Sequence, residues 1–415
     1  MIRSVILAIV IVTPGRAATP PPVAVPPYYS VDYEASETAG ELGVAVTHTL
    51  WIPPGVKTLR GVIVHQHGCG ISAGVSGITA AYDLHWQALA KKWDCALLGP
   101  AYHLRKDTEC RKWCDPRNGS DAAFQKALAH FAEESKHPEL TTVPWCLWGH
   151  SGGGFWSSLM LTLHPERIAA IFFRSGSAYA IWERGEIPKP VLTPVVYEVP
   201  FLFIGGVKEA QDKSHGPARL GDQAMLKAWR EHGAPGGIAS DPLSGHECGD
   251  SRYLAIAFFD ACLAQRLPEP GSQALKPAGK GVIIDNSWLP GAGFAKAWAS
   301  YNQTGRPRDD TPPPAPTDVR LTHQELSWKA EADLESGLGG FIIEQDGKVI
   351  AKLPEKPVGK LGTPLFQGLS GGDTPVLAQP PMHYDLKNLT TSGHAYTVRS
   401  VNAAGLVSAA AAAKN

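Results

Sequence analysis

Residues 144–163 read Pro-Trp-Cys-Leu-Trp-Gly-His-Ser-Gly-Gly-Gly-Phe-Trp-Ser-Ser-Leu-Met-Leu-Thr-Leu, the most informative segment of the chain. Apolar residues 144–148 predict a buried strand, and residues 153–164 have the spacing of a helix. Between them stands Gly149-His150-Ser151-Gly152-Gly153. Glycines on both sides permit a strained, sharp turn that lifts the Ser151 hydroxyl above the sheet, with the positive end of the helix beneath it. The pattern predicts that Ser151 is a nucleophile.

Outward from this stretch, short apolar runs alternate with amphipathic stretches between residues 33 and 267. The alternation is typical of a parallel sheet covered by helices. We expect strands at 61–66, 95–100, 144–148, 169–174, 201–205 and 237–240, and helices at 80–92, 121–135, 153–164, 220–232 and 252–265. Ser120 is expected to cap the second helix. Residues 177–200 contain four prolines, which predicts an irregular excursion over a site.

Length and charge limit the class of protein. A chain of 415 residues exceeds one typical domain, so we expect two. Hydrophobic residues make up 44% and charged residues 19%, which excludes a disordered, collagen-like or coiled-coil protein. The net charge is −1, and the chain has no basic footprint of the kind that nucleic-acid binding requires. We therefore expect no nucleic-acid partner.

The N-terminus predicts export. Arg3 precedes an apolar run at residues 5–12, and Gly15-Arg16-Ala17 has the small-x-small pattern of a cleavage site. We expect residues 1–17 to be a signal peptide. The mature protein is then expected to be periplasmic or extracellular, without a transmembrane segment.

Seven cysteines fit an oxidising compartment, and their odd number leaves at least one thiol. Three lie in apolar runs, where buried thiols are expected: Cys95, Cys146 and Cys262. Four lie in polar or glycine-containing segments and are disulfide candidates whose pairing the sequence leaves open: Cys69, Cys110, Cys114 and Cys248. The same four permit a zinc site, but no C-x-x-C pair supports it, and we expect no metal.

The chain changes character after residue 267. Residues 268–315 are rich in proline and glycine, and their end reads Asp309-Asp-Thr-Pro-Pro-Pro-Ala-Pro316. This composition predicts a stiff linker at 268–315. Runs with strand-like alternation follow and predict a small antiparallel sandwich. Leu326-Ser-Trp328 and Tyr396-Thr-Val-Arg-Ser-Val-Asn-Ala-Ala-Gly405 resemble a fibronectin type III domain. We expect such an all-β domain at 316–411, with Trp328 in its core.

A serine nucleophile requires an oxyanion hole with a second backbone donor, from a loop after an early strand. His67-Gly68-Cys69-Gly70 follows the apolar run at 61–66. We expect the amide of Cys69, or of a neighbour, to act beside that of Gly152.

A general base must follow the last strand, and an acid must follow the strand before it. His246 fits the position of the base, and His215, which precedes a predicted helix, is the alternative. Glu209 follows the strand at 201–205 by a short loop, and Asp212 is the alternative acid. The chain order Ser, acid, His differs from the orders of the two well-known serine protease classes.

Residues 33–267 resemble the α/β-hydrolase superfamily through the His-Gly-Cys-Gly loop, the Gly-His-Ser-Gly-Gly turn and the late Gly-His-Glu. The resemblance implies an eight-stranded, mostly parallel sheet flanked by helices and acyl-transfer hydrolysis, so we expect a catalytic domain at 28–267. More narrowly, the chain looks like secreted esterases of the polyhydroxyalkanoate depolymerase and feruloyl esterase group. The insertion at residues 102–120 departs from that group.

The function that we expect is ester hydrolysis through a Ser-His-carboxylate triad and an acyl-enzyme, without metal or organic cofactor. Four aromatic residues are expected to line the substrate pocket: Tyr102, Trp156, Tyr179 and Trp182. Three alternatives remain open. The protein is a depolymerase of polyesters or polysaccharide esters with the C-terminal domain as a tether, a serine peptidase, or a non-catalytic adhesion protein on a hydrolase scaffold. The oligomeric state also stays open.

Overall fold

The computed structural model describes residues 24–70, 80–105, 108–269, 274–355, 382–386 and 393–414. The signal peptide expected at 1–17 and residues 356–381 of the expected C-terminal domain lie outside the described residues. No helix in the described part of the chain is long and apolar enough to cross a membrane.

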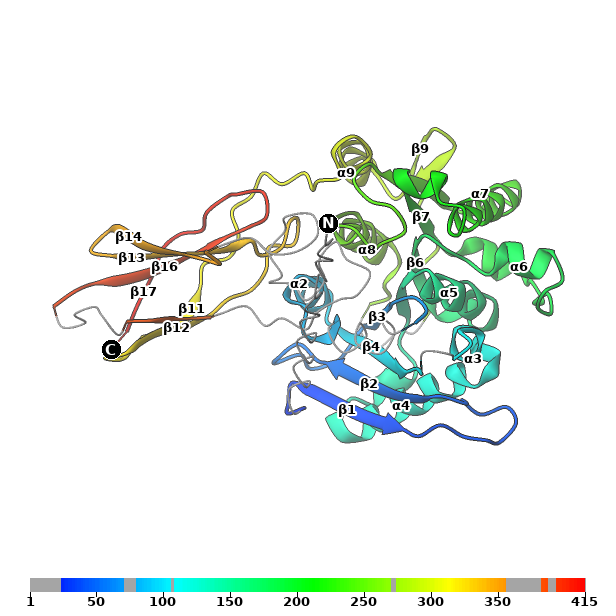
Figure 1. Ribbon diagram of the computed structural model, residues 1–415, viewed down its shortest axis with the longest axis horizontal. Coiled ribbons are helices and arrows are strands. Elements are labelled where there is room, and N and C mark those ends of the chain that lie inside the picture. Colours follow the sequence, from blue (N-terminus) through cyan, green and yellow to red (C-terminus); the bar gives the residue numbers. More distant parts are fainter. Residues whose placement is uncertain are drawn as a thin grey trace, which may run out of the picture.

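An eight-stranded sheet with the order β1-β2-β4-β3-β5-β6-β7-β8 forms the centre of the larger domain (Figure 1). Its strands are Tyr28–Tyr33 (β1), Ala45–Trp51 (β2), Gly61–Gln66 (β3), Cys95–His103 (β4), Trp145–His150 (β5), Ile168–Arg174 (β6), Phe201–Gly206 (β7) and Gly236–Asp241 (β8). Strands β3 to β8 are parallel, and β2 is antiparallel to both its neighbours. The six expected strands are confirmed. The sequence missed β1 and β2, because neither has a continuous apolar run: β1 is half-exposed, and Thr47, His48 and Thr49 interrupt β2.

Helices cover both faces of this sheet. On one face lie α4 (Ser120–Ser135), α5 (Gly152–Leu163), α6 (Tyr179–Glu183) and α7 (Gly216–Glu231), and on the other lie α2 (Leu84–Lys92), α8 (Arg252–Arg266) and α9 (Ala292–Thr304). Side chains alternate along a strand, so in β5 Trp145 and Leu147 join the first core and Cys146 and Trp148 the second. A strand buried on both faces is apolar throughout, which explains why the sequence pattern located it.

Short elements join the main ones: α3 (Arg111–Cys114) and the 3-10 turns η1 (Pro116–Asn118), η2 (Pro138–Thr141), η3 (Pro165–Arg167), η4 (Pro194–Glu198) and η5 (Val207–Gln211). The capping role expected for Ser120 is wrong. Gly119 is the N-cap of α4, and the Ser120 hydroxyl instead donates to the carbonyl of Trp113 at 2.6 Å.

The linker expected at 268–315 is wrong for much of its length. The hairpin of β9 (Val282–Ile284) and β10 (Ser287–Leu289), together with α9, lies against the edge strand β8. Trp298 Nε1 donates to the carbonyl of Ile238 at 2.9 Å, and the amide of Ser240 donates to Asn302 Oδ1 at 2.7 Å. These bonds satisfy backbone groups that an edge strand would otherwise expose. The larger domain therefore extends to α9.

The C-terminal region contains two antiparallel sheets. One comprises β11 (Thr317–Leu321), β12 (Glu325–Lys329) and β15 (His383–Asp385), and the other β13 (Gly340–Gln345), β14 (Lys348–Leu353), β16 (Tyr396–Val401) and β17 (Ala411–Ala412). Trp328 is buried in their core, as expected, with its ring 5.1 Å from that of Phe341. The core also contacts α2 of the larger domain through Leu84 and Ala88.

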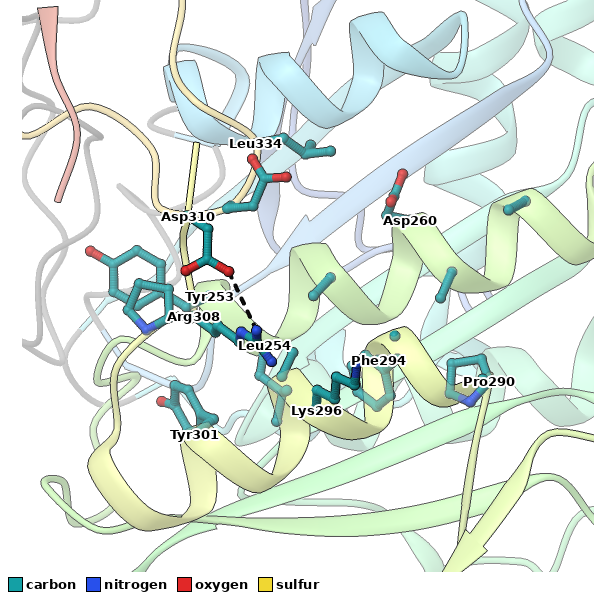
Figure 2. Close-up of a pocket in the computed structure, with 18 of the residues that line it drawn as sticks. Tyr253, Leu254, Asp260, Pro290, Phe294, Lys296, Tyr301, Arg308, Asp310 and Leu334 are labelled. Carbon is teal, nitrogen blue, oxygen red and sulfur yellow. Dashed lines mark hydrogen bonds and ion pairs between the residues drawn. The ribbon is translucent and has the colours of Figure 1, made fainter. Parts of the chain in front are cut away.

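A cavity of about 610 Å³ lies where α8 and α9 meet the segment that enters the C-terminal region (Figure 2). Tyr253, Phe294 and Tyr301 contribute to its wall, and so do Arg308 and Asp310, which form an ion pair at 3.4 Å. None of the residues that the sequence proposed for catalysis lines it. The residues proposed for catalysis lie elsewhere, around Ser151, which directly follows β5.

Candidate active site

Ser151 occupies a strained turn between β5 and α5. Its φ of 52° and ψ of −114° are rarely adopted by a residue with a side chain. The flanking glycines permit the turn, because a Cβ at Gly149 would lie 2.4 Å from the carbonyl oxygen of Gly153, and one at Gly153 would lie 2.1 Å from that of Gln66. The strand, sharp turn and helix expected from the sequence are therefore present, and only glycine fits two residues before and two residues after the serine.

His246 joins Ser151 to a carboxylate. Its Nε2 lies 2.9 Å from Ser151 Oγ, and its Nδ1 lies 2.7 Å from Oε1 of Glu209. The carboxylate accepts a hydrogen bond at Nδ1, which leaves Nε2 free to accept the hydroxyl proton of Ser151. His246 follows β8 and Glu209 lies in η5, directly after β7, which are the positions that the sequence assigned to base and acid.

Glu209 is fully buried and surrounded by donors. The Ser175 hydroxyl donates to its Oε2 at 2.6 Å, and the guanidinium of Arg174 lies 3.7 Å from the same oxygen. Burial raises the pKa of Glu209, but the hydrogen bonds from His246 and Ser175 and the charge of Arg174 outweigh it, so that its pKa lies below the usual value. Glu209 is therefore a carboxylate at neutral pH, suited to stabilise a cation on His246.

The alternative acid and base pair with each other instead. Asp212 Oδ2 lies 2.8 Å from Nδ1 of His215, and both side chains are more than 40% exposed. The geometry thus favours Glu209 over Asp212 and His246 over His215 as partners of Ser151. His215 is nevertheless close, since its ring is stacked on that of His246.

Sequence reasoning missed Arg174 and Ser175, at the end of β6. Fully buried Arg174 donates to Ser244 Oγ at 2.9 Å and to the carbonyls of Gly245 at 2.7 Å and Cys248 at 3.2 Å, so it holds the loop that carries His246. Its guanidinium also contacts the carbonyl of Glu247. A single arginine that ends an otherwise apolar strand is a signal that would have identified it, because a buried cation requires such partners.

The expected oxyanion donors lie next to each other. Gly152 is the first residue of α5, where backbone amides have no partner within the helix. A Cβ on Gly152 would lie 3.2 Å from the backbone nitrogen of Cys69. Gly68 lies equally close to the turn, since a Cβ there would be 2.8 Å from the Cβ of Ser151. Two backbone amides beside the nucleophile are what an oxyanion hole requires, and this role of Cys69 and Gly152 stays a prediction.

A disulfide joins Cys69 to Cys110, with the two Cα atoms 5.4 Å apart. A disulfide that involves two of the four candidates is thus present, and it fixes the loop at residues 67–70 to the start of α3. The expectation was wrong for Cys114 and Cys248, which are buried thiols in the described structure. Burial raises the pKa of Cys114, which disfavours the thiolate. Cys248 Sγ lies 3.3 Å from Nδ1 of His67. The expected burial of Cys95, Cys146 and Cys262 is confirmed.

A pocket of about 300 Å³ contains Ser151 and Gly152. Its wall combines the Cys69–Cys110 disulfide with apolar side chains of three helices and two arginines, and the principal members are Phe155, Ala180, Ile181, Ala218, Arg111 and Arg184. Ala180 and Ile181 belong to the proline-rich excursion at 177–200, which therefore does reach the pocket, as expected.

None of the four aromatic residues expected in the pocket lines it in the described structure. Tyr102, Trp156 and Trp182 are core residues with 2% exposure or less, and Tyr179 has its ring 5.6 Å from Trp229. Burial of a large aromatic ring removes the most apolar area from water, so such rings are favoured in the core over a solvent-accessible pocket. On α5 the pocket side chain is Phe155, the neighbour of Trp156, because successive helix residues point about 100° apart.

Three buried histidines, His65, His67 and His150, lie behind the loop that carries His246, and His150 contacts that residue directly. His150 Nε2 lies 2.7 Å from the carbonyl oxygen of His246, and His65 stacks on Trp148 at 3.9 Å. Desolvation by burial places the pKa values of His65, His67 and His150 well below the usual value, so these rings are neutral. One ligand atom each of His67, His150 and Cys248 lies within 4.8 Å of the others, a spacing compatible with a metal ion.

The mostly parallel sheet, its flanking helices and the serine turn fit the α/β-hydrolase fold. No protein-family model matches the chain, and no curated protein matches its sequence. Solved structures that resemble it include poly(aspartic acid) hydrolase-1 from Sphingomonas sp. KT-1 (17% identity, TM-score 0.37, 52% of this chain and 93% of that one). Dienelactone hydrolase from Anabaena variabilis (17%, 0.37, 58% and 99%) and a cold-adapted esterase from an Arctic intertidal metagenomic library (15%, 0.38, 58% and 94%) are others.

Proposed function

We propose that this protein is a serine hydrolase that cleaves carboxylic esters. The observation that carries the proposal is the continuous path from Ser151 Oγ through both ring nitrogens of His246 to the buried carboxylate of Glu209. A strained serine at the start of a helix, beside two backbone amides, supplies the other half of an acyl-transfer site.

Acylation uses each of these groups in turn. Ser151 Oγ attacks the acyl carbon while His246 Nε2 takes the hydroxyl proton, and Glu209 stabilises the imidazolium through Nδ1. The amides of Gly152 and Cys69 hold the oxyanion of the tetrahedral intermediate. When the intermediate collapses, the C–O bond to the alcohol breaks, and the imidazolium returns its proton to the leaving oxygen. The products are the free alcohol and the acyl ester of Ser151.

Deacylation repeats the sequence with water. His246 takes a proton from water as the water oxygen attacks the acyl carbon, and a second tetrahedral intermediate forms in the same oxyanion hole. Its collapse expels Ser151 Oγ, which recovers the proton from His246. The carboxylic acid leaves, and the resting serine is restored without any external co-reactant.

The pocket supports a small acyl group. Its volume of about 300 Å³ is at the lower end of the range for ligand pockets, about 300–1,000 Å³. Its apolar wall, which includes Phe155 and Ile181, suits a short aliphatic chain. We therefore propose acetyl and butyryl esters as better substrates than decanoyl esters.

We further propose export and a spacer role for the C-terminal region. The Cys69–Cys110 disulfide supports an oxidising compartment, together with the signal-peptide pattern at residues 1–17. The two antiparallel sheets around Trp328 support a fibronectin type III-like domain. Such a domain would hold the hydrolase near a polymeric ester, which is the second substrate class that we keep.

The test is hydrolysis of p-nitrophenyl acetate, butyrate and decanoate by the mature protein and by Ser151→Ala. Wild-type turnover should fall from butyrate to decanoate, and Ser151→Ala should lose it on all three esters. Ser135→Ala is the matched control, because this serine ends α4 and donates to Phe131 in the same helix, remote from the pocket. It should keep wild-type turnover.

A fluorophosphonate probe separates the other outcomes. Labelling of Ser151 without ester turnover would move the proposal to a bulkier substrate, a polymeric ester or a peptide. If the probe does not label the wild type and no ester is hydrolysed, the protein is not a serine hydrolase, and the adhesion-protein alternative gains. Polymer binding is also measured for the fragment 316–411 and for the full chain. Comparable binding by the two would support the tether.

A further inference from the structure

A second histidine–carboxylate pair lies beside the proposed catalytic pair. The rings of His215 and His246 are stacked, with their centroids 4.0 Å apart and their planes 17° apart. His215 Nδ1 in turn lies 2.8 Å from Oδ2 of Asp212. The two residues that the sequence offered as alternatives to His246 and Glu209 are therefore joined to each other and stacked on the first choice.

Asp212 fixes the orientation of His215. Its Oδ1 accepts the backbone amides of Ser214 at 2.8 Å and His215 at 3.3 Å, and its Oδ2 accepts the ring Nδ1–H. The hydrogen bonds from the His215 ring and the Ser214 amide lower the pKa of Asp212, so it is anionic at neutral pH. The carboxylate thus closes the turn between η5 and α7 and sets the plane of the His215 ring.

His246 is held on several sides, and His215 is the outermost of its neighbours. The backbone carbonyl of His246 is hydrogen-bonded to buried His150, and buried Arg174 donates to the carbonyl of the preceding residue, Gly245. The side chain of His246 is 14% exposed, whereas that of His215 is 44% exposed. His215 therefore covers a face of the His246 ring from the solvent side.

The ring of His246 has least support after acylation. In the resting enzyme two hydrogen bonds fix its plane, one at Ser151 Oγ and one at Glu209 Oε1. In the acyl-enzyme, Ser151 Oγ carries the acyl group and has no proton to donate. The bond to Glu209, the stack on His215 and the tilted contact with the ring of His150, 5.2 Å away between centroids, then remain. They keep Nε2 directed at the acyl carbon, where the attacking water must be activated.

We propose that His215, oriented by Asp212, is a positioning residue that keeps the His246 ring in its catalytic plane. This inference rests on the proposed function. His215 does not exchange the proton itself, because it has no hydrogen bond to Ser151 in the described structure and its Nδ1 is committed to Asp212. It acts through the flat face that it presents to His246, so a different flat ring should replace it.

The experiment compares His215→Ala with His215→Phe on p-nitrophenyl butyrate. His215→Ala should lower kcat about 10- to 100-fold, since a small misplacement of a catalytic group costs up to about 10²-fold, and should change KM less than about 3-fold. His215→Phe retains a stacking ring and should restore kcat to within about 3-fold of wild type. His232→Ala is the control: it removes a ring stacked at 4.2 Å on Tyr197, away from Ser151, and should leave kcat unchanged.

Asp212→Ala extends the test. If Asp212 acts through His215, Asp212→Ala should lower kcat by a smaller factor, about 3- to 10-fold. The double variant Asp212→Ala/His215→Ala should have the same kcat as His215→Ala, because the effects of two residues that act together are not additive. The variant that combines Asp212→Ala with His215→Phe should have a higher kcat than Asp212→Ala, because the phenylalanine ring stacks on His246 without needing the carboxylate.

Three results would overturn the inference: wild-type kcat in His215→Ala, equal loss in His215→Phe and His215→Ala, or an additive loss in the double variant. A fall in melting temperature of His215→Ala that accounts for the activity, with no change in kcat per folded molecule, would also overturn it. Fluorophosphonate labelling keeps the two levels separate. A wild type that is neither labelled nor active on any ester rejects the proposed function, whereas equal labelling rates of wild type and His215→Ala, with equal kcat, reject only the role of His215.

Discussion

Two histidine–carboxylate pairs lie side by side in this protein and differ mainly in what surrounds them. The nitrogen–oxygen distances are alike, 2.7 Å for His246–Glu209 and 2.8 Å for His215–Asp212. Glu209 is fully buried and contacts Ser175 and Arg174, whereas Asp212 is 41% exposed and bonds within its own turn. Only the buried pair reaches Ser151. The two pairs thus have similar geometry, and burial with its neighbouring donors is what places one of them against the serine.

The largest expected effect comes from neutralising the two carboxylates separately. Glu209→Gln should lower kcat about 10³- to 10⁴-fold, because the amide no longer stabilises the imidazolium and favours the wrong tautomer of His246. Asp212→Asn should lower it less than about 10-fold. Both are measured on p-nitrophenyl butyrate at neutral pH. Equal losses in the two variants would contradict the ranking of the buried pair above the exposed one.

The next effect concerns the cation behind the buried pair. Arg174→Met should lower the free energy of unfolding by about 3–5 kcal/mol, because it removes the donors of several buried carbonyls and leaves Glu209 without its buried cation. Lys276→Met, which removes the exposed pair with Glu269, should leave the free energy of unfolding nearly unchanged, because water screens this pair. Urea unfolding of both variants measures the difference. A similar small loss in both would show that Arg174 is not structurally required.

The smallest effect concerns pH and the neutral histidines beneath the site. The pKa values of His65, His67 and His150 lie well below the usual value, and that of His48 is about 3. Below about pH 6.5 the unfolded chain binds protons that the folded chain does not bind. These histidines therefore do not lower the free energy of unfolding above about pH 6.5. As the pH falls below that value, each of them lowers it by about 1.4 kcal/mol per pH unit.

His65→Phe should remove one of these protons and keep a ring against Trp148, on which His65 now stacks at 3.9 Å. Its free energy of unfolding should fall less steeply with decreasing pH, by about 1.4 kcal/mol per pH unit relative to wild type. Urea unfolding at pH 7, 6 and 5 measures both slopes. Parallel slopes would mean that His65 is already protonated in the folded protein, contrary to its burial.

Short-range signals in the sequence led to the correct elements. The apolar run at 144–148 and the glycines around Ser151 predicted β5, the turn and α5, because these depend on neighbouring residues. The position of His246 after the last strand was predicted from chain order. The aromatic pocket residues, the helix within the expected linker and the role of Arg174 were not, since each depends on which distant segment lies against it.

The parallel strands, the serine turn and the candidates for base and acid follow from the amino-acid sequence alone. Backbone strain, apolar periodicity and chain order are local properties that can be read along the chain. That Glu209 rather than Asp212 contacts His246, and that Asp212 and His215 form a second pair stacked on the first, depends on the folded chain. Glu209 and Asp212 lie three residues apart in the chain and differ in burial. Glu209 is buried against Arg174 at the end of β6 and against His246, and no local sequence pattern encodes these contacts.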